Sequence, residues 1–216
     1  MKVLVFGANG QIGKHLVSLI RKNDKLEAKA AIRKEEQADY FKDLGADVAI
    51  VNLEGEIEDM AKAAEDVDAV VFTAGSGPNT GKDKTIMVDL DGAVKTIEAA
   101  KQANVKRYIM ISSFDTTREA IQSAPESFAP YVVAKHYADE WLRDTDLDYT
   151  IIHPGALTNE AGKNQVELAE QVERGEVPRE DIAHVILESL LNDSTIKKEF
   201  QVVSGNSTIE DAIRSL

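Results

Sequence analysis

The sequence contains no cysteine, so disulfide bonds, thiolate catalysis and zinc–thiolate sites are excluded. No apolar run approaches the length that is needed to span a bilayer. The first residues are typical of a β-strand that carries one lysine, and not of a signal peptide. From these absences we expect a cytoplasmic protein with no membrane partner and no metal site.

Basic residues are also scarce, because 25 lysines and arginines stand against 38 aspartates and glutamates, a formal net charge of −13. Binding to nucleic acid depends on a basic surface, so we expect no nucleic-acid partner. The acidic residues are spread over the expected helix faces, which favours a solvated acidic surface. A phosphate bound to such a surface needs its own cations, so arginines and lysines near a predicted site gain interest.

Short β-rich apolar runs alternate with longer helical stretches along the 216 residues. This alternation predicts an α/β fold, a mostly parallel sheet of about seven strands with helices on both faces. We expect strands at 3–6, 27–32, 47–51, 69–72, 108–111, 149–153 and 200–203. We expect helices at 11–22, 35–43, 56–65, 84–103, 131–145, 165–173, 179–192 and 207–214.

The most informative motif joins the first expected strand to the first expected helix. Gly7, Gly10 and Gly13 follow one another at intervals of three residues, and an amphipathic segment comes directly after them. Glycine permits a tight turn and a close approach of a ligand to the main chain. The N–H groups and the partial positive charge at a helix start then favour an anion. The motif therefore predicts a pyrophosphate-binding site.

A second motif, Tyr131 and Lys135 in YVVAK, lies on an expected helix. Side chains four residues apart share a helix face, so both can reach one cleft. A neighbouring lysine favours the phenolate, and we expect it to lower the tyrosine pKa and to make the tyrosine a usable proton donor. Ser112 and Ser113 end the fifth expected strand, where a hydroxyl could bind a substrate oxygen or simply be a polar strand end.

In their order and spacing, these motifs resemble the short-chain dehydrogenase/reductase superfamily, specifically its atypical, extended-like NAD(P)-binding members. The resemblance covers essentially the full length and implies a Rossmann-like, doubly wound fold. The GxxGxxG spacing is the form that the extended group uses. The resemblance rests on GANGQIG (7–13), AIRK (31–34), VNLEG (51–55), VFTAGSG (71–77), VDLDGAVKTIEAAKQANVKRYIMISS (88–113), YVVAK (131–135), LDYTIIHPGALT (147–158) and VPREDIAHVI (177–186).

The resemblance implies roles for individual residues. Ser113, Tyr131 and Lys135 match the catalytic Ser–Tyr–Lys triad, in which Lys135 also contacts the cofactor. Asn52 stands where the family usually has an aspartate beside the adenine, and His153 stands where many relatives have arginine. His153 is also compatible with a simple hydrogen-bonded residue at a strand end. The implied cofactor-binding residues are Gly7, Asn9, Gly10, Gln11, Ile12, Gly13, Asn52, Leu53, Thr73, Ala74, Gly75, Lys135, His153, Pro154, Gly155 and Leu157.

The second expected strand indicates which dinucleotide binds. An NAD-binding strand usually ends in an acid that holds the ribose 2′-hydroxyl. Here the strand ends at Ile32 and is followed by Arg33 and Lys34, with no acid. Arginine can form two hydrogen bonds with a 2′-phosphate, and lysine adds charge. We therefore expect NADP(H) to be preferred over NAD(H).

These observations predict an NADP-dependent oxidoreductase that moves a hydride between nicotinamide and a small carbonyl or alcohol. We expect one domain over residues 1–216, whose substrate side is a small cap from about 112–130 and 155–180. The alternatives are a nucleotide-sugar epimerase or dehydratase, which the short C-terminal part disfavours, and a non-catalytic NmrA-like sensor of NAD(P). Fold resemblance does not prove turnover. We expect a small-molecule substrate and a monomer or homodimer.

Overall fold

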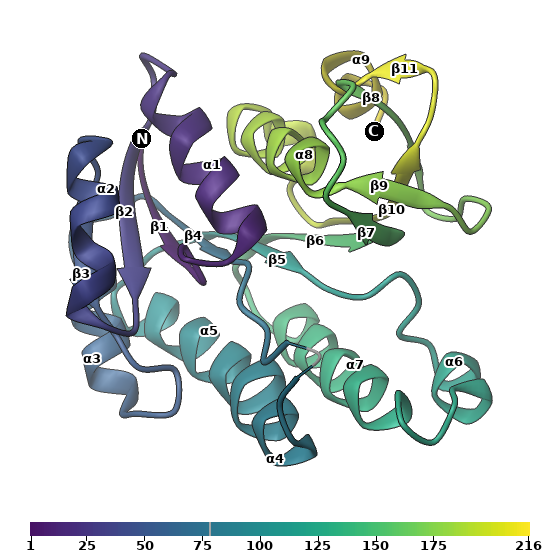
Figure 1. Cartoon of the computed structure of the whole chain (residues 1–216), viewed down its shortest axis with the longest axis horizontal. Coiled ribbons are helices and arrows are strands. Elements are labelled where there is room, and N and C mark those ends of the chain that lie inside the picture. Colours follow the sequence, from purple (N-terminus) through teal and green to yellow (C-terminus); the bar gives the residue numbers. More distant parts are fainter. Residues whose placement is uncertain (78) are drawn as a thin grey trace.

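The computed structural model describes residues 1–77 and 79–216, and a twisted sheet of nine strands forms its centre (Figure 1). From edge to edge the strands are β11 (Ser207–Thr208), β8 (Gln165–Ala169), β10 (Lys198–Ser204), β6 (Asp148–Pro154), β5 (Arg107–Ile111), β4 (Ala69–Phe72), β1 (Lys2–Phe6), β2 (Glu27–Ile32) and β3 (Asp47–Ile50). β7 (Ala156–Thr158) and β9 (Glu176–Pro178) form a separate parallel pair.

The seven strands from β3 to β10 run parallel, which confirms the predicted doubly wound sheet. Val5 of β1 is level with Ala30 of β2 and Val71 of β4, so these strands end at one edge. The strand order reverses direction at β1, between β2 and β4, which is where open α/β sheets bind ligands. β8 and β11 extend the sheet by antiparallel pairing, which makes nine strands instead of about seven.

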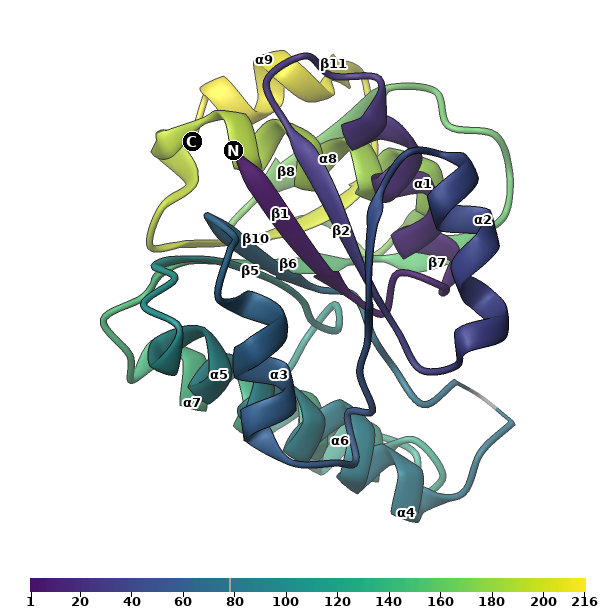
Figure 2. The same ribbon diagram turned by 90° about the vertical axis from the view of Figure 1, so that its left-hand side faces the viewer.

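Helices cover both faces of the sheet (Figures 1 and 2). α1 (Gln11–Arg21), α2 (Ala38–Asp43), α8 (Arg179–Leu191) and α9 (Ile209–Arg214) share one apolar core with the sheet. α3 (Ile57–Ala64), α5 (Ala93–Gln102) and α7 (Ala129–Arg143) share the opposite core. Shorter elements are η1 (Glu35–Gln37), α4 (Lys82–Lys84), the π-helical turn η2 (Thr85–Gly92), α6 (Arg118–Ser123) and η3 (Asp193–Thr195). Among the described residues no helix combines the length and the apolar character that a bilayer crossing requires.

The two cores explain why the first strand is apolar at almost every position. Val3 and Val5 of β1 face the core beneath α1 and α8, whereas Leu4 and Phe6 face the core beneath α3 and α5. All four side chains are at most 1% exposed. A strand that is buried on both faces gains no benefit from polar positions, so its sequence shows no polar alternation.

One predicted element is wrong, because residues 165–169 form strand β8 and the rest of the expected helix 165–173 is not helical. Val166 is buried, Glu167 is exposed and Leu168 is half-buried, which is the period-2 pattern of a strand with one covered face. β8 pairs with the edge of β10, and that tertiary pairing overrides the helical preference of the acidic residues. The expected helix 84–103 is also divided, because its first half forms the π-helical turn η2.

Candidate functional site

The glycine turn closes tightly against the neighbouring loop. Gly7 has a φ of +81°, and a Cβ there would lie 2.5 Å from the backbone nitrogen of Ala74, after β4. A Cβ on Gly13 would lie 2.3 Å from the carbonyl oxygen of Gly7. The N–H of Gly10, the residue before α1, donates to that same oxygen at 2.9 Å. Only glycine fits at positions 7 and 13, and the turn leaves the first N–H groups of α1 available to an anion.

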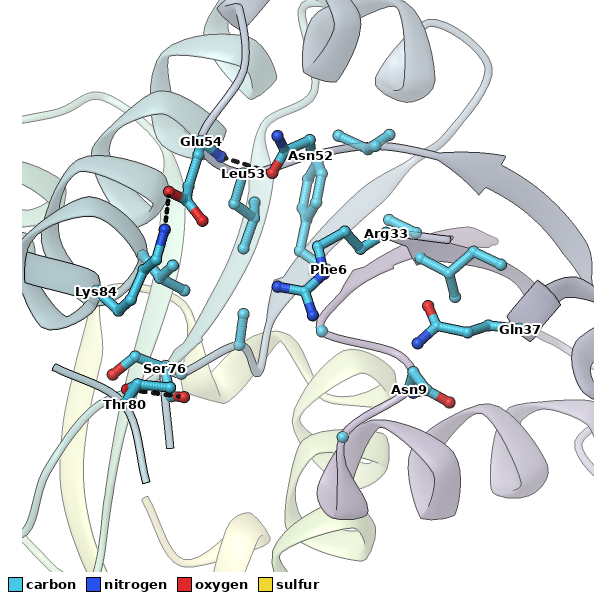
Figure 3. Close-up of a pocket in the computed structure, with 18 residues that line it drawn as sticks. Phe6, Asn9, Arg33, Gln37, Asn52, Leu53, Glu54, Ser76, Thr80 and Lys84 are labelled. Carbon is cyan, nitrogen blue, oxygen red and sulfur yellow. Dashed lines mark hydrogen bonds and ion pairs between the residues drawn. The ribbon is translucent and has the colours of Figure 1, made fainter. Parts of the chain in front are cut away.

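A cavity of about 340 Å³ opens beside this turn, at the carboxyl ends of β1, β2 and β4. Figure 3 shows the Arg33 guanidinium near its centre, with Asn9 and Gln37 on one side and Glu54 and Lys84 on the other. The predicted residues that line it are Gly7, Asn9, Gly10, Arg33, Asn52, Leu53, Ala74 and Gly75. The lining residues that were not predicted are Phe6, Ala31, Ile32, Gln37, Val51, Glu54, Ser76, Thr80, Lys84 and Val88.

The two cations after β2 are placed differently. Arg33 lines the cavity. Lys34 does not line it, and its Nζ is paired with the exposed Glu36 at 3.1 Å. On the opposite wall, the side-chain oxygen of Asn52 accepts from the backbone N–H of Glu54 at 3.1 Å, and its amide NH₂ makes no hydrogen bond to another described residue. The Glu54 carboxylate in turn binds Lys84 Nζ at 2.6 Å across the mouth of the cavity.

Several predicted residues lie near the cavity without lining it. Ile12 and Gly13 are buried in the first turn of α1. The Thr73 hydroxyl donates to the Phe6 carbonyl oxygen at 3.0 Å and so holds the ends of β1 and β4 together. Other predicted residues outside the cavity lining are Gln11, Lys34, Ser113, Tyr131, Lys135, His153, Pro154, Gly155 and Leu157.

Tyr131 and Lys135 share one face of α7, as the spacing predicted. Lys135 is buried, and its Nζ donates to the Ile111 carbonyl oxygen at 2.9 Å. The same Nζ lies 5.9 Å from the centre of the Tyr131 ring. Burial lowers the pKa of Lys135, although the negative charges of Asp89 and Asp139 act to raise it. Burial also raises the pKa of Tyr131, and the same two carboxylates raise it further. The expectation that Lys135 lowers the Tyr131 pKa is therefore wrong for this structure.

Asp89 is a site residue that the sequence reasoning missed. It lies in the π-helical turn η2, is 1% exposed, and accepts a hydrogen bond from the Ser76 N–H at 3.0 Å through Oδ2. Its Oδ1 has no partner among the described residues. Asp89 thus connects the cavity wall at Ser76 with the surroundings of Tyr131 and Lys135. A lone acid inside the apolar run MVDL was the available signal.

A buried polar network fixes the loop after β5. The Asp139 carboxylate accepts from the hydroxyls of Ser112 at 2.7 Å and Thr116 at 2.8 Å. Ser112 is therefore bound within the protein, whereas the Oγ of the half-buried Ser113 makes no hydrogen bond to any other described residue. His153 Nδ1 donates to the Ser113 carbonyl oxygen at 2.7 Å, because a carbonyl can only accept.

The other side of His153 faces Glu199. His153 Nε2 lies 3.4 Å from the Glu199 carboxylate, which Arg143 also binds at 2.6 and 2.7 Å. Burial opposes the charged ring, but Glu199, Asp139 and the Ser113 carbonyl outweigh it and raise the pKa of His153. Burial likewise opposes the charged Glu199, but Arg143 and His153 lower its pKa to about 2. His153 is thus a hydrogen-bonded residue at a strand end, outside the cavity lining.

Comparisons with a protein family, with curated proteins and with solved structures all find NAD(P)H-binding, epimerase-like or oxidoreductase proteins. A family model described as NAD(P)H-binding matches residues 7–193. The protein named "Uncharacterized sugar epimerase YhfK" from Bacillus subtilis (strain 168) is 46% identical over 216 residues, which is 100% of both chains. A solved structure from Bacillus halodurans, provisionally named an NAD-dependent epimerase/dehydratase, is 41% identical with a TM-score of 0.93 over 100% of both chains. The oxidoreductase ylbE from Lactococcus lactis is 32% identical with a TM-score of 0.90, covering 100% of this chain and 96% of that one.

Proposed function

Because the chain belongs to the NAD(P)H-binding family, we propose that it is an NADP-dependent oxidoreductase that interconverts a small carbonyl compound and its alcohol. The observation that carries this proposal is the position of Asp89. Asp89 contacts the cavity wall at Ser76 and also acts on the pKa values of Tyr131 and Lys135. One buried side chain thus contacts the cavity wall and lies within electrostatic range of the tyrosine–lysine pair.

The cavity fits the dinucleotide on steric and electrostatic grounds. Gly7 and Gly13 have no room for a Cβ, which is the arrangement that lets a pyrophosphate approach backbone N–H groups at the start of α1. Arg33, with Gln37 beside it, would hold the 2′-phosphate of NADP, and none of the described lining residues at the end of β2 is an acid that could hold a 2′-hydroxyl. Asn52 and Leu53 would lie against the adenine. We propose that the other residues predicted from the family motif serve the same cofactor.

Tyr131 would act as the proton donor. When bound, the nicotinamide supplies or accepts the hydride. The raised pKa keeps the Tyr131 phenol protonated at neutral pH, so its proton is present when a carbonyl is reduced. An alkoxide is a much stronger base than a phenolate, so the transfer from Tyr131 remains downhill. The Oγ of Ser113 would donate to the reacting oxygen, and Lys135 would hold the tyrosine and balance the charge of Asp89.

Replacing Tyr131 with phenylalanine tests the proposal, because the substitution removes one hydroxyl and keeps the ring. We expect NADPH oxidation with a panel of aldehydes, ketones and quinones to fall about 10²–10⁴-fold, the usual contribution of a general acid. The NADPH dissociation constant should stay unchanged in the same variant. Unchanged turnover in Tyr131→Phe would remove this mechanism.

The names of the Bacillus relatives favour a second candidate, an epimerase or dehydratase acting on a sugar derivative. An epimerase needs its dinucleotide back at the end of each cycle, so it holds the cofactor through purification. A reductase exchanges it in every turnover. Release of the cofactor on denaturing the freshly purified protein would favour the epimerase, whereas rapid exchange of added NADPH would favour the reductase. Tight binding of NADPH without any turnover would instead favour a sensor.

A further inference from the structure

Three residues outside the dinucleotide cavity join two loops at the carboxyl edge of the sheet. The guanidinium of Arg174 lies 5.1 Å from the centre of the Phe114 ring. Gln201 in β10 donates from Nε2 to the Phe114 carbonyl oxygen at 2.8 Å, and its Oε1 accepts from the Val172 N–H at 2.9 Å. One side chain therefore fixes the loop after β5 relative to the loop between β8 and β9, which carries Arg174.

This junction adjoins the residues assigned to the chemistry. Phe114 directly follows Ser113. Gly175, next to Arg174, accepts a hydrogen bond from the Ala156 N–H at 2.9 Å. A Cβ on Gly155 would lie only 2.4 Å from the Gly175 carbonyl oxygen, so the two backbones touch. Arg174 thus lies between the Ser113 loop and the segment that follows β6.

The hydrogen-bond donors of Arg174 are available to a ligand. Its side chain is exposed, and within residues 1–77 and 79–216 it forms no ion pair. Other arginines on this side are already bound: Arg143 to Glu199, and Arg179 to the Leu157 carbonyl oxygen at 3.0 Å. Arg174 thus keeps a guanidinium without an ion-pair partner among the described residues, although the exposed Glu173 and Glu176 flank it in the sequence.

We propose that Arg174 binds a carboxylate of the substrate and that Gln201 is the positioning residue that holds Arg174 at the mouth of the site. The substrate class is then a carbonyl compound that also carries a carboxylate, and this inference rests on the proposed reductase function. A planar guanidinium can bind a carboxylate through two parallel hydrogen bonds. The stack on Phe114 restricts the side chain before the substrate arrives, which reduces the ordering that binding requires.

The test compares matched substrates that differ only in charge, beginning with 4-carboxybenzaldehyde and methyl 4-formylbenzoate. We expect wild type to prefer the carboxylate in kcat/KM by about tenfold or more, since only the carboxylate can form two parallel charge-assisted hydrogen bonds with the guanidinium. Arg174→Gln should lose this preference through a higher KM for the carboxylate, with the ester unchanged. Arg118→Gln is the control, because Arg118 stacks on the exposed Tyr137 at a similar 5.2 Å.

Gln201→Leu removes both loop contacts while keeping the size of the side chain. If Gln201 positions Arg174, the carboxylate-to-ester ratio of kcat/KM should fall in this variant while kcat with the ester is retained. If Gln201 had a purely structural role, kcat/KM would fall by the same factor for the carboxylate and for the ester. If wild type reduces both aldehydes with equal kcat/KM and Arg174→Gln changes neither value, the carboxylate proposal is overturned. The proposed reductase function would still hold.

Failure of the proposed reductase function can also be distinguished from failure of the carboxylate site. If neither aldehyde is reduced, saturation-transfer NMR measures the binding of 4-carboxybenzaldehyde to the protein saturated with NADP⁺. Binding that depends on Arg174 would support the carboxylate site while the reductase function fails. Binding that is absent, or that Arg174→Gln leaves unchanged, would overturn the inference.

Discussion

Around the cavity that we propose for the dinucleotide, close main-chain contacts at glycines shape the site, whereas beside it, under the loop after β5, hydrogen-bonded polar side chains shape it. We use "nucleotide half" for the cavity residues around Gly7, Gly13 and Arg33. We use "network half" for the cluster of Ser112, Thr116, Asp139, Arg143, His153 and Glu199. In the first half, glycines bring main-chain segments within van der Waals distance. In the second half, hydrogen bonds of buried polar side chains hold a loop in place.

We therefore expect the two halves to fail separately. Loss of a ligand contact in the nucleotide half changes cofactor binding with little effect on folding. Loss of a charge in the network half leaves buried partners unpaired, which lowers the free energy of unfolding.

The largest expected effect comes from Asp139→Ala in the network half. The substitution leaves the hydroxyls of Ser112 and Thr116 without their acceptor and removes the carboxylate near His153. We expect the free energy of unfolding to fall by about 3 kcal/mol, as for other broken buried charge networks. Urea denaturation measures this loss. The folded fraction should bind NADPH with the affinity of wild type.

The exposed Asp146 provides the matched control, because Asp146→Ala removes the same charge from the turn after α7. It should change stability by less than about 0.5 kcal/mol, as is usual for surface sites. A weakened NADPH affinity in Asp139→Ala, at unchanged stability, would show that the two halves are not separable.

The next effect is in the nucleotide half. Arg33→Ala should weaken NADPH binding by about 1.5–3 kcal/mol, the range for a hydrogen bond to a charged group, and leave NADH binding and stability unchanged. Isothermal titration calorimetry measures both dissociation constants. Lys34→Ala is the control, because Lys34 pairs with Glu36 outside the cavity lining. Equal affinities of wild type for NADPH and NADH would contradict the predicted cofactor preference.

The smallest effect is the pH dependence of the network half. The pKa of His153 is raised above its ordinary 6.5, so the stability it contributes is complete below pH 6.5 and is lost as the pH rises through the folded value. The pKa of Glu199 is lowered from 4.5 to about 2, so its contribution is present above pH 4.5 and is lost towards pH 2. We therefore expect the pair of His153 and Glu199 to stabilise the fold most between about pH 4.5 and 6.5.

Two measurements check the direction in which stability changes with pH. The melting temperature of wild type should fall above pH 6.5, and the NMR signal of the His153 ring should titrate at a pH above 6.5. A His153 signal that titrates below 6.5 would mean that burial outweighs Glu199 and Asp139. Glu199→Gln should reduce the loss of stability on the acid side.

The nucleotide half could be predicted from the sequence because its rules are local. Three glycines within seven residues identified the turn, and Arg33 directly after β2 identified the cation in the cavity. The parallel pairing of seven strands followed from the apolar runs and the long crossovers, whereas their order in the sheet was not predicted. The helix expected at 165–173 failed because pairing with β10, thirty residues further on, decides that segment.

The network half could not be predicted in the same way. His153 meets Ser113 across 40 positions and Glu199 across 46, so no local spacing signals the contact. The Tyr131–Lys135 spacing did predict a shared helix face. The pKa of Tyr131 depends on Asp89 and on burial, and both are properties of the assembled fold. Asp89 itself was hidden because a π-helical turn cannot be recognised from residue periodicity alone.

The central claim is that the nucleotide half binds NADPH and that the adjoining Tyr131 completes a reduction. The most direct test is a single turnover with NADPH deuterated at C4 of the nicotinamide and an excess of an accepted aldehyde. We expect deuterium on the product carbinol carbon, with transfer slowed about 10²–10⁴-fold in Tyr131→Phe at unchanged NADPH affinity. Tight binding of the deuterated NADPH with no deuterium in any product of the carbonyl panel would contradict it.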